Sequence, residues 1–337
     1  MPHLRLPSRY QIRMWLLSLG MFALALGLLG SIGWGARVLW RQTHSPASVT
    51  SMTSVTSATS GTATSDSAAN RPTGVDTGLV INDPVLDQVM LAAINADRQA
   101  NGLVPVAWDA TAAAAGAAHA SEMAALGFFS HWSPDGFGPE MRYARAGGTD
   151  NAMENIFTSS SRYSDGRPAP IESFADLVVQ AERDLMQSPG HRRNILMPSH
   201  THVGMGFAYN PQTGSFYLVQ EFVDRYVVMQ PLPQTAPVGA LMTVAGQLLP
   251  GSDAPLINAT YAPFPQPMSL DELNATGTYL RAAQIYAPVS PQVAGDGSFS
   301  ASVPLDYAGR PGIYSVRVWV TVGGEQVPAS EQLIEVR

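Results

Sequence analysis

Three side chains in the middle of the sequence have the chemistry of a metal site or an acid–base site. They are His131 in the stretch FFSHWSPDG, Glu154 in MENI and His191 in SPGHRRNIL. Two imidazoles and a carboxylate are ligands that zinc accepts, and histidine changes charge near neutral pH, which also suits general acid–base catalysis. The three lie far apart in the sequence, so spacing alone leaves open that they are turn, helix-start and ion-pair residues.

The composition excludes several other kinds of site. The 19 basic residues are all arginine, so lysine Schiff-base chemistry and a lysine-bearing phosphate loop are excluded. The sequence contains no cysteine, so the chain has no disulfides. Its net charge of −7 argues against nucleic-acid binding, which requires a basic surface.

An uncharged apolar run over residues 14–36 is long enough for a helix to cross a membrane. It is too long for the apolar core of a cleaved signal peptide, so we expect an uncleaved transmembrane anchor. Three arginines precede it and two follow closely, which weakly places residues 1–13 in the cytoplasm and the rest of the chain outside. Residues 37–78 are rich in Ser and Thr and predict a disordered stalk.

The region after the stalk begins with helices and ends with strands. Asp83 and Pro84 suit the start of a helix, and Gly102 suits its end. An alanine-rich helix is expected over residues 109–126, and a third over residues 171–186. The stretches THVGMGFAYN and SFYLVQEFV have the composition of strands. Helices followed by strands predict an α+β fold.

These segments, taken in order, resemble the CAP superfamily of cysteine-rich secretory proteins, antigen 5 and pathogenesis-related proteins, also called SCP domains. The resemblance covers residues 83–224 and rests on LAAINADRQANG, FFSHWSPDG, ENI, SPGHRRNIL and VGMGFAYN with FYLVQEF. The sequence is most similar to the cysteine-free bacterial branch. The resemblance implies an α-β-α sandwich with a large cleft.

In that family two histidines and two acidic residues face the cleft, which identifies His131, His191 and Glu154 as three of the four. The fourth acid does not carry over, because Leu185 and Ser188 occupy the matching positions. The candidates for the fourth place are Glu182, Asp184, His202 or none. His119 also matches a family position, and we expect it to have a structural role in its helix.

The C-terminal part differs in character from the rest. Three prolines mark a linker at residues 229–237, and short apolar or alternating runs separated by turn residues follow it. These runs predict a small β-sandwich of immunoglobulin-like shape. The expected organisation is a cytoplasmic N-terminus (1–13), anchor (14–36), stalk (37–78), CAP domain (79–228), linker (229–237) and β-sandwich (238–337).

Three functions fit this organisation. The first is binding of a divalent metal ion, with zinc expected, through His131, His191 and Glu154; if the metal activates water, the protein would be a hydrolase of peptide or cell-envelope material. The second is a binding module for a lipid or peptide. The third is a surface adhesion or scaffold protein whose β-sandwich carries the partner site. All three place the protein in the cell membrane with an extracytoplasmic ligand.

Overall fold

The computed structural model describes residues 79–81, 83–278 and 283–337. The predicted cytoplasmic N-terminus (1–13), membrane anchor (14–36) and stalk (37–78) lie outside the described residues. Within the described part, none of the helices is long and apolar enough to span a membrane.

An antiparallel sheet forms the centre of the first half. Strands β4 (His202–Asn210) and β5 (Ser215–Asp224) pair with each other, β3 (Asn151–Ser160) adds to β5, and β1 (Leu79–Val80) adds to β4. The short β2 (Ala107–Trp108) pairs with β4 in parallel. Strand β3 is therefore at the edge of this sheet.

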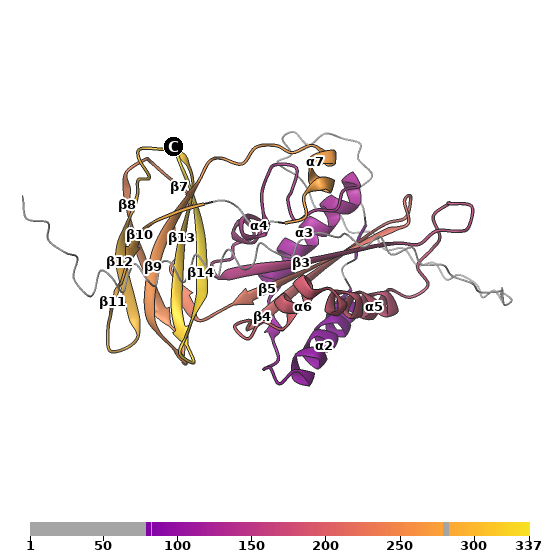
Figure 1. Cartoon of the computed structure of the whole chain (residues 1–337), viewed down its shortest axis with the longest axis horizontal. Helices are drawn as coiled ribbons and strands as arrows, with labels where there is room; N and C mark the ends of the chain where they lie inside the picture. Colours follow the sequence, from indigo (N-terminus) through magenta and orange to yellow (C-terminus); the bar gives the residue numbers. More distant parts are fainter. Residues whose placement is uncertain (1–78, 82, 279–282) are drawn as a thin grey trace, which may run out of the picture. The chain divides into compact units, whose positions relative to one another are not determined.

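Helices cover both faces of the sheet (Figure 1). On one face α2 (Pro84–Ala100), α5 (Phe174–Gln187) and α6 (Pro189–Ile195) share an apolar core with the sheet. On the other face lie α3 (Ala110–Leu126) and α4 (Pro139–Arg145). The three layers confirm the mixed α/β architecture expected from the sequence.

Helix ends follow the local signals in the sequence. The Asp83 side chain accepts a hydrogen bond from Val85 N (2.9 Å), and Asp109 caps α3 by accepting one from Ala112 N (2.7 Å). Gly127 ends α3 in the left-handed conformation, with a φ of 75°. Each of these ends was predicted within one residue.

Helix α3 packs unusually close to β4 because of two glycines. A Cβ added at Gly204 or Gly206 would come within 2.0 Å of the backbone nitrogens of Ala113 and Ala117, respectively. Only glycine on the strand and small residues on the helix allow this approach. The close packing of α3 on β4 therefore requires both the Gly-x-Gly of β4 and the alanines of α3.

The C-terminal half contains two further sheets around a common apolar core. One has the order β10-β9-β13-β14-β7 and the other β11-β12-β8-β6. The β-rich region is thus confirmed, whereas its immunoglobulin-like topology stays a prediction. The strands are β6 (Val227–Met229), β7 (Thr235–Ala236), β8 (Ala240–Leu248), β9 (Ser252–Ala262), β10 (Gln284–Val289), β11 (Gln292–Val293), β12 (Ser298–Leu305), β13 (Gly312–Val322) and β14 (Glu325–Val336).

Two features change the boundaries drawn from the sequence. The expected linker at 229–237 contains β7, which pairs with β14. In addition, residues 262–278, which we call the return segment, run from β9 back to the first half and include α7 (Leu270–Ala275). Leu273 is fully buried in one apolar cluster with Met123 and Phe128. The return segment is therefore part of the core beside α3.

Candidate functional site

Strand β3 carries the residues that support both predicted histidines. Side chains alternate between the faces of a strand, so Glu154 and Asn155 point to opposite sides of the sheet. Glu154 faces the layer of α3 and α4, where His131 lies, and Asn155 faces the layer of α5 and α6, where His191 lies. The adjacent residues Glu154 and Asn155 thus each contact one of the two histidines.

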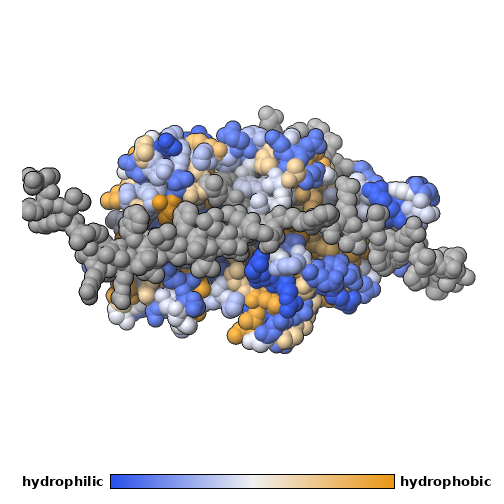
Figure 2. Space-filling model, viewed as in Figure 1, coloured by the Kyte–Doolittle hydropathy of each residue, from blue (hydrophilic) through white to orange (hydrophobic). Residues whose placement is uncertain are grey.

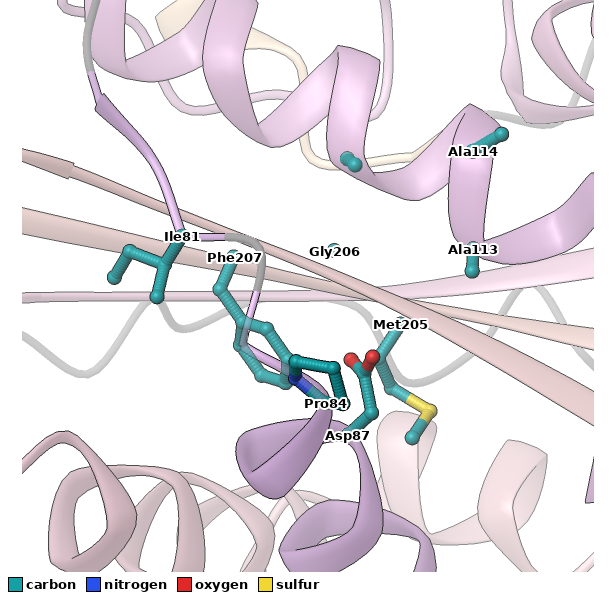
Figure 3. Close-up of a pocket in the computed structure, with 9 residues that line it drawn as sticks. Ile81, Pro84, Asp87, Ala113, Ala114, Met205, Gly206 and Phe207 are labelled. Carbon is teal, nitrogen blue, oxygen red and sulfur yellow. The ribbon is translucent and has the colours of Figure 1, made fainter. Parts of the chain in front are cut away.

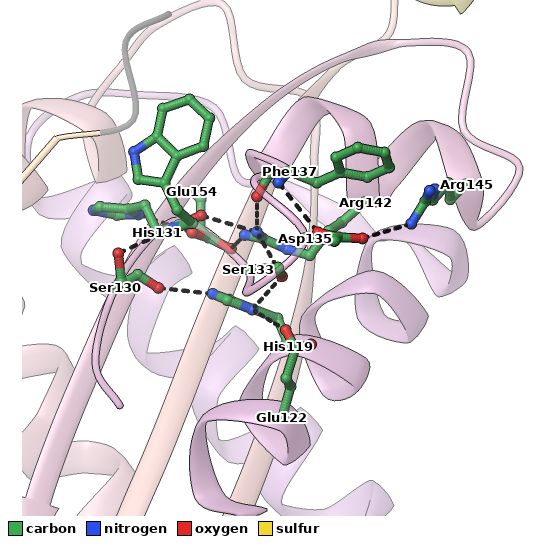
Figure 4. A network of polar contacts seen from close by, with 11 residues as sticks. His119, Glu122, Ser130, His131, Ser133, Asp135, Phe137, Arg142, Arg145 and Glu154 are labelled. Atoms are coloured by element: carbon green, nitrogen blue, oxygen red, sulfur yellow. Dashed lines mark hydrogen bonds and ion pairs between the residues drawn. The ribbon is translucent and has the colours of Figure 1, made fainter. Parts of the chain in front are cut away.

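His131, Glu154 and Arg142 form a buried charged cluster (Figure 4). His131 Nδ1 lies 2.8 Å from Glu154 Oε1, and Arg142 donates to Glu154 Oε2 at 2.6 Å. The Glu154 side chain is fully buried, and those of His131 and Arg142 are 13% and 11% exposed. Arg142, which belongs to no motif recognised in the sequence, also donates to the carbonyls of His131 and Phe137.

Glu154 fixes the orientation of His131. Burial alone would raise the pKa of Glu154, but the positive charges of Arg142, His119 and His131 lower it to about 2. The ionised carboxylate accepts the proton on His131 Nδ1, which directs Nε2 to the opposite side of the ring. This is the arrangement of a histidine prepared to bind a metal ion or to exchange a proton.

His119 supports the loop that carries His131. Its Nε2 lies 2.8 Å from the carbonyl of Ser130, and its Nδ1 lies 3.4 Å from Ser133 Oγ. The residue is only 1% exposed, and burial lowers its pKa. These contacts agree with a structural role.

A second buried carboxyl group lies next to Glu154. Glu221 on β5 is paired directly with Glu154 in the register of the two strands and is 1% exposed. Burial, followed by the negative charge of Glu154, raises the pKa of Glu221 well above its ordinary value. A second negative charge beside Glu154 is therefore disfavoured in this interior.

His191 lies in the first turn of α6 and is half-buried. Its Nδ1 is buried and has no hydrogen-bond partner among the described residues. Burial and then the charge of His131 lower the pKa of His191 to about 4, so the imidazole is neutral at pH 7.

A network of neutral amides occupies the face of the sheet behind His191. Asn155 Nδ2 lies 3.4 Å from the carbonyl oxygen of His191 and donates to Gln220 Oε1 at 3.0 Å. Asn194 Nδ2 donates to Asn155 Oδ1, also at 3.0 Å. Polar residues within the apolar run YLVQEF of β5 were a signal for this network that the sequence analysis did not use.

The candidates for a fourth cleft residue lie in different places. Glu182 is buried and accepts a hydrogen bond from Gln220. Asp184 is exposed and bonds to Gln180 on its own helix. His202 lies on β4 and contacts Thr201 and Arg225.

The three predicted residues are not arranged as a complete set of ligands for the expected metal ion. Within the described part of the chain, no group of three or more His, Cys, Asp or Glu side chains is arranged to hold a metal. Both carboxylate oxygens of Glu154 already accept hydrogen bonds. The described residues therefore do not form a closed site of three or more protein ligands.

The hollows of the described surface include one beside α3 and one beside Trp132. One, of about 230 Å³, lies between the start of α2 and α3 and is lined by Asp87, Met205 and Phe207 among others (Figure 3). The other, of about 490 Å³, lies between Trp132 and the return segment and is lined by Phe264, Pro265 and Met268 among others. Trp132, which lines the second hollow, follows His131 in the sequence. The lining of this hollow is predominantly apolar.

Comparison with known proteins concerns mainly this first half. Residues 91–222 match the family CAP, described as the cysteine-rich secretory protein family. The uncharacterized protein YkwD of Bacillus subtilis (strain 168) is 30% identical over 165 residues, which cover 48% of this chain and 56% of YkwD. The chain thus spans little more than half the length of that curated relative.

Two solved structures are also similar. An extracellular protein containing an SCP domain from Bacillus anthracis str. Ames is 25% identical, with a TM-score of 0.33, over 42% of this chain and 41% of its own. An outer surface protein from Borrelia burgdorferi is 16% identical, with a TM-score of 0.35, over 44% of this chain and 98% of its own.

Proposed function

Since residues 91–222 form a CAP domain, we propose that the chain is an extracytoplasmic CAP-domain protein that binds a divalent metal ion, zinc by expectation, through His131 and His191. Water completes the coordination. The predicted helix at residues 14–36 would anchor the protein in the membrane, and the β-rich half would be its immunoglobulin-like outer part.

The observation that carries this proposal is the hydrogen bond from His131 to Glu154. Histidines that bind metals usually donate their other ring N–H to a carboxylate, which fixes the tautomer and makes the ring a better ligand. Glu154 therefore acts behind His131 as a positioning residue, and Arg142 holds Glu154 in place. His191 contributes a second imidazole that is neutral at pH 7.

Titration calorimetry of zinc into the full-length protein tests the proposal. We expect saturable binding at about pH 7.5 that weakens toward pH 4, where His191 takes up a proton. The His131→Ala/His191→Ala variant should not bind zinc, and Glu154→Gln should bind it about 10- to 100-fold more weakly. His202→Ala is the matched control. Unchanged binding in the double variant would exclude this site.

The metal ion would supply a Lewis acid that lowers the pKa of a bound water, which is the chemistry of hydrolysis. The substrates to screen are peptides and cell-envelope fragments. In such a reaction the proton on His131 Nδ1 would stay hydrogen-bonded to Glu154. The Glu154 carboxylate would stabilise any positive charge that the ring acquires.

A second candidate function rests on the apolar hollow beside Trp132. A predominantly apolar hollow of this kind suits a lipid or peptide ligand. Elsewhere, the exposed large apolar side chains lie singly on separate elements, as Val85, Leu241 and Ile285 do, and hydrophilic and hydrophobic residues are mixed over the face in Figure 2. A ligand extracted from the purified protein, and still present in the double histidine variant, would favour this function.

A further inference from the structure

A chain of five hydrogen-bonded side chains crosses the buried layer between the sheet and helices α5 and α6. Gln220 Nε2 donates to Glu182 Oε2 (2.6 Å), Asn155 Nδ2 to Gln220 Oε1 (3.0 Å) and Asn194 Nδ2 to Asn155 Oδ1 (3.0 Å), and Asn194 Oδ1 lies 2.9 Å from His200 Nε2. All five residues are at most 6% exposed. Each amide uses its nitrogen toward one neighbour and its oxygen toward the other, so the chain has a direction.

The two ends of the chain carry the groups that can ionise. His200 Nδ1 lies 2.7 Å from Asp224 Oδ1, so both ring nitrogens of His200 face oxygen atoms. In the direction given above, both nitrogens must therefore carry protons, and His200 is a cation while Glu182 is a carboxylate.

The hydrogen bonds of the chain run in the opposite direction when the amide groups of Gln220, Asn155 and Asn194 are each rotated by half a turn. Glu182 then donates a proton to Gln220, each amide donates to the next, and Asn194 donates to His200 Nε2. His200 keeps its proton on Nδ1 and is neutral. The two arrangements contain the same number of protons, because the proton that leaves His200 Nε2 is balanced by the proton on Glu182.

The surroundings of Glu182 favour this second direction. Glu182 Oε1 is buried without a hydrogen-bond partner, and within the described residues Glu182 forms no ion pair with arginine or histidine. Burial, and then the negative charge of Asp97, raises its pKa to about 8.

The surroundings of His200 are compatible with a neutral ring. Asp224 would favour a positive charge there, but its other oxygen accepts from Asn151 (2.8 Å), and the Arg98 guanidinium interacts with its charge. Arg98 also donates to the carbonyl oxygen of His200 (3.2 Å). The Arg98 guanidinium thus supplies a positive charge near Asp224, so Asp224 does not require His200 to carry a second proton.

We propose that Glu182 is the proton-donating end of this chain at neutral pH, and that the chain runs through Gln220, Asn155 and Asn194 to a neutral His200. The chain reverses, with the three amides turned, when Glu182 gives up its proton and His200 Nε2 takes one up. The chain passes directly behind the proposed site, because Asn155 lies beside the carbonyl of His191. The end of Asn155 that meets this carbonyl changes from oxygen to nitrogen when the chain reverses, so Asn155 is a positioning residue for His191.

Nitrogen NMR of the metal-free full-length protein, labelled with ¹⁵N in its 7 histidines, tests this proposal. At pH 7 we expect a neutral His200 with its proton on Nδ1 and an unprotonated Nε2, assigned by comparison with His200→Gln. Glu182→Gln should leave this signature unchanged, because glutamine also donates. Asp184→Asn, on the exposed side of the same helix, is the control.

The result that overturns the proposal is a His200 with protons on both nitrogens at pH 7 in the unmodified protein. This measurement needs no variant to fold. It is also independent of zinc, so its failure would leave the proposed metal site untouched, and failure of zinc binding would leave the chain of amides untouched.

Discussion

The two faces of the β3–β5 ladder support their histidines by different means. On one face Glu154 and Arg142 hold His131 through charges. On the other, Asn155, Gln220 and Asn194 lie behind His191 and are all neutral. A buried charge tolerates only partners of opposite charge, whereas an amide offers both a donor and an acceptor. The hydrogen bonds of the charged face can therefore form in one direction only, whereas those of the amide face can form in two.

The largest expected effect comes from breaking the charged face. Arg142→Leu leaves the fully buried Glu154 carboxylate without its cation and should lower the free energy of unfolding by about 3–5 kcal/mol. Urea denaturation measures the loss. Arg145→Leu removes an exposed ion pair from the same helix and should cost less than about 1 kcal/mol. Equal losses in the two variants would contradict the assigned role of Arg142.

The next effect is a dependence of the free energy of unfolding on pH, which has opposite signs for the two faces. The pKa of Glu182 is raised in the folded protein, so its stabilising contribution is complete below about pH 4.5 and is lost as the pH rises toward 8, by at most about 1.4 kcal/mol per pH unit. The pKa of Glu154 is lowered, so its contribution is present above about pH 4.5 and is lost toward pH 2.

Urea denaturation from about pH 3 to 9 separates these two contributions. Glu182→Gln should remove the loss on the alkaline side and leave the acid side as it was, and Asp184→Asn should change neither side. An alkaline loss of the same size in Glu182→Gln would show that another group causes it.

The smallest of these effects should come from removing one amide. Asn155→Leu leaves Gln220 and Asn194 without one partner each and should cost about 2 kcal/mol, less than Arg142→Leu, because no charge is left unpaired. Asn101→Leu, which replaces an exposed asparagine, is the matched control. A loss in Asn155→Leu larger than that in Arg142→Leu would reverse the comparison between the two faces.

Local features of the fold could be predicted from the sequence because their causes are local. The caps of α2 and α3 depend on residues within one helical turn. Asp83 caps α2 as expected, and the helix expected over residues 109–126 is found at Ala110–Leu126. The family assignment of residues 91–222 is likewise confirmed. The roles of His131, His191 and Glu154 as metal ligands stay predictions.

The support of the site could not be predicted because it depends on contacts between distant residues. Glu221 meets Glu154 only through the register of β3 and β5, and a shift of one residue would have placed Gln220 there instead. Arg142 lies on a short helix whose direction no local pattern specifies. The return segment was missed because its prolines resemble those of a surface loop, while its buried contact, Leu273, is a single residue.

The return segment also constrains the order in which the protein is made. Phe129 N donates a hydrogen bond to Asn274 Oδ1 across 145 positions of sequence, and Leu273 completes the apolar cluster around Phe128. A growing chain that has reached the end of β5 still exposes that part of the cluster, because its last member has not yet been synthesised. The family-matched region therefore finishes folding only after much of the β-rich half has emerged, and cutting the chain between the two would leave the first half with an open core.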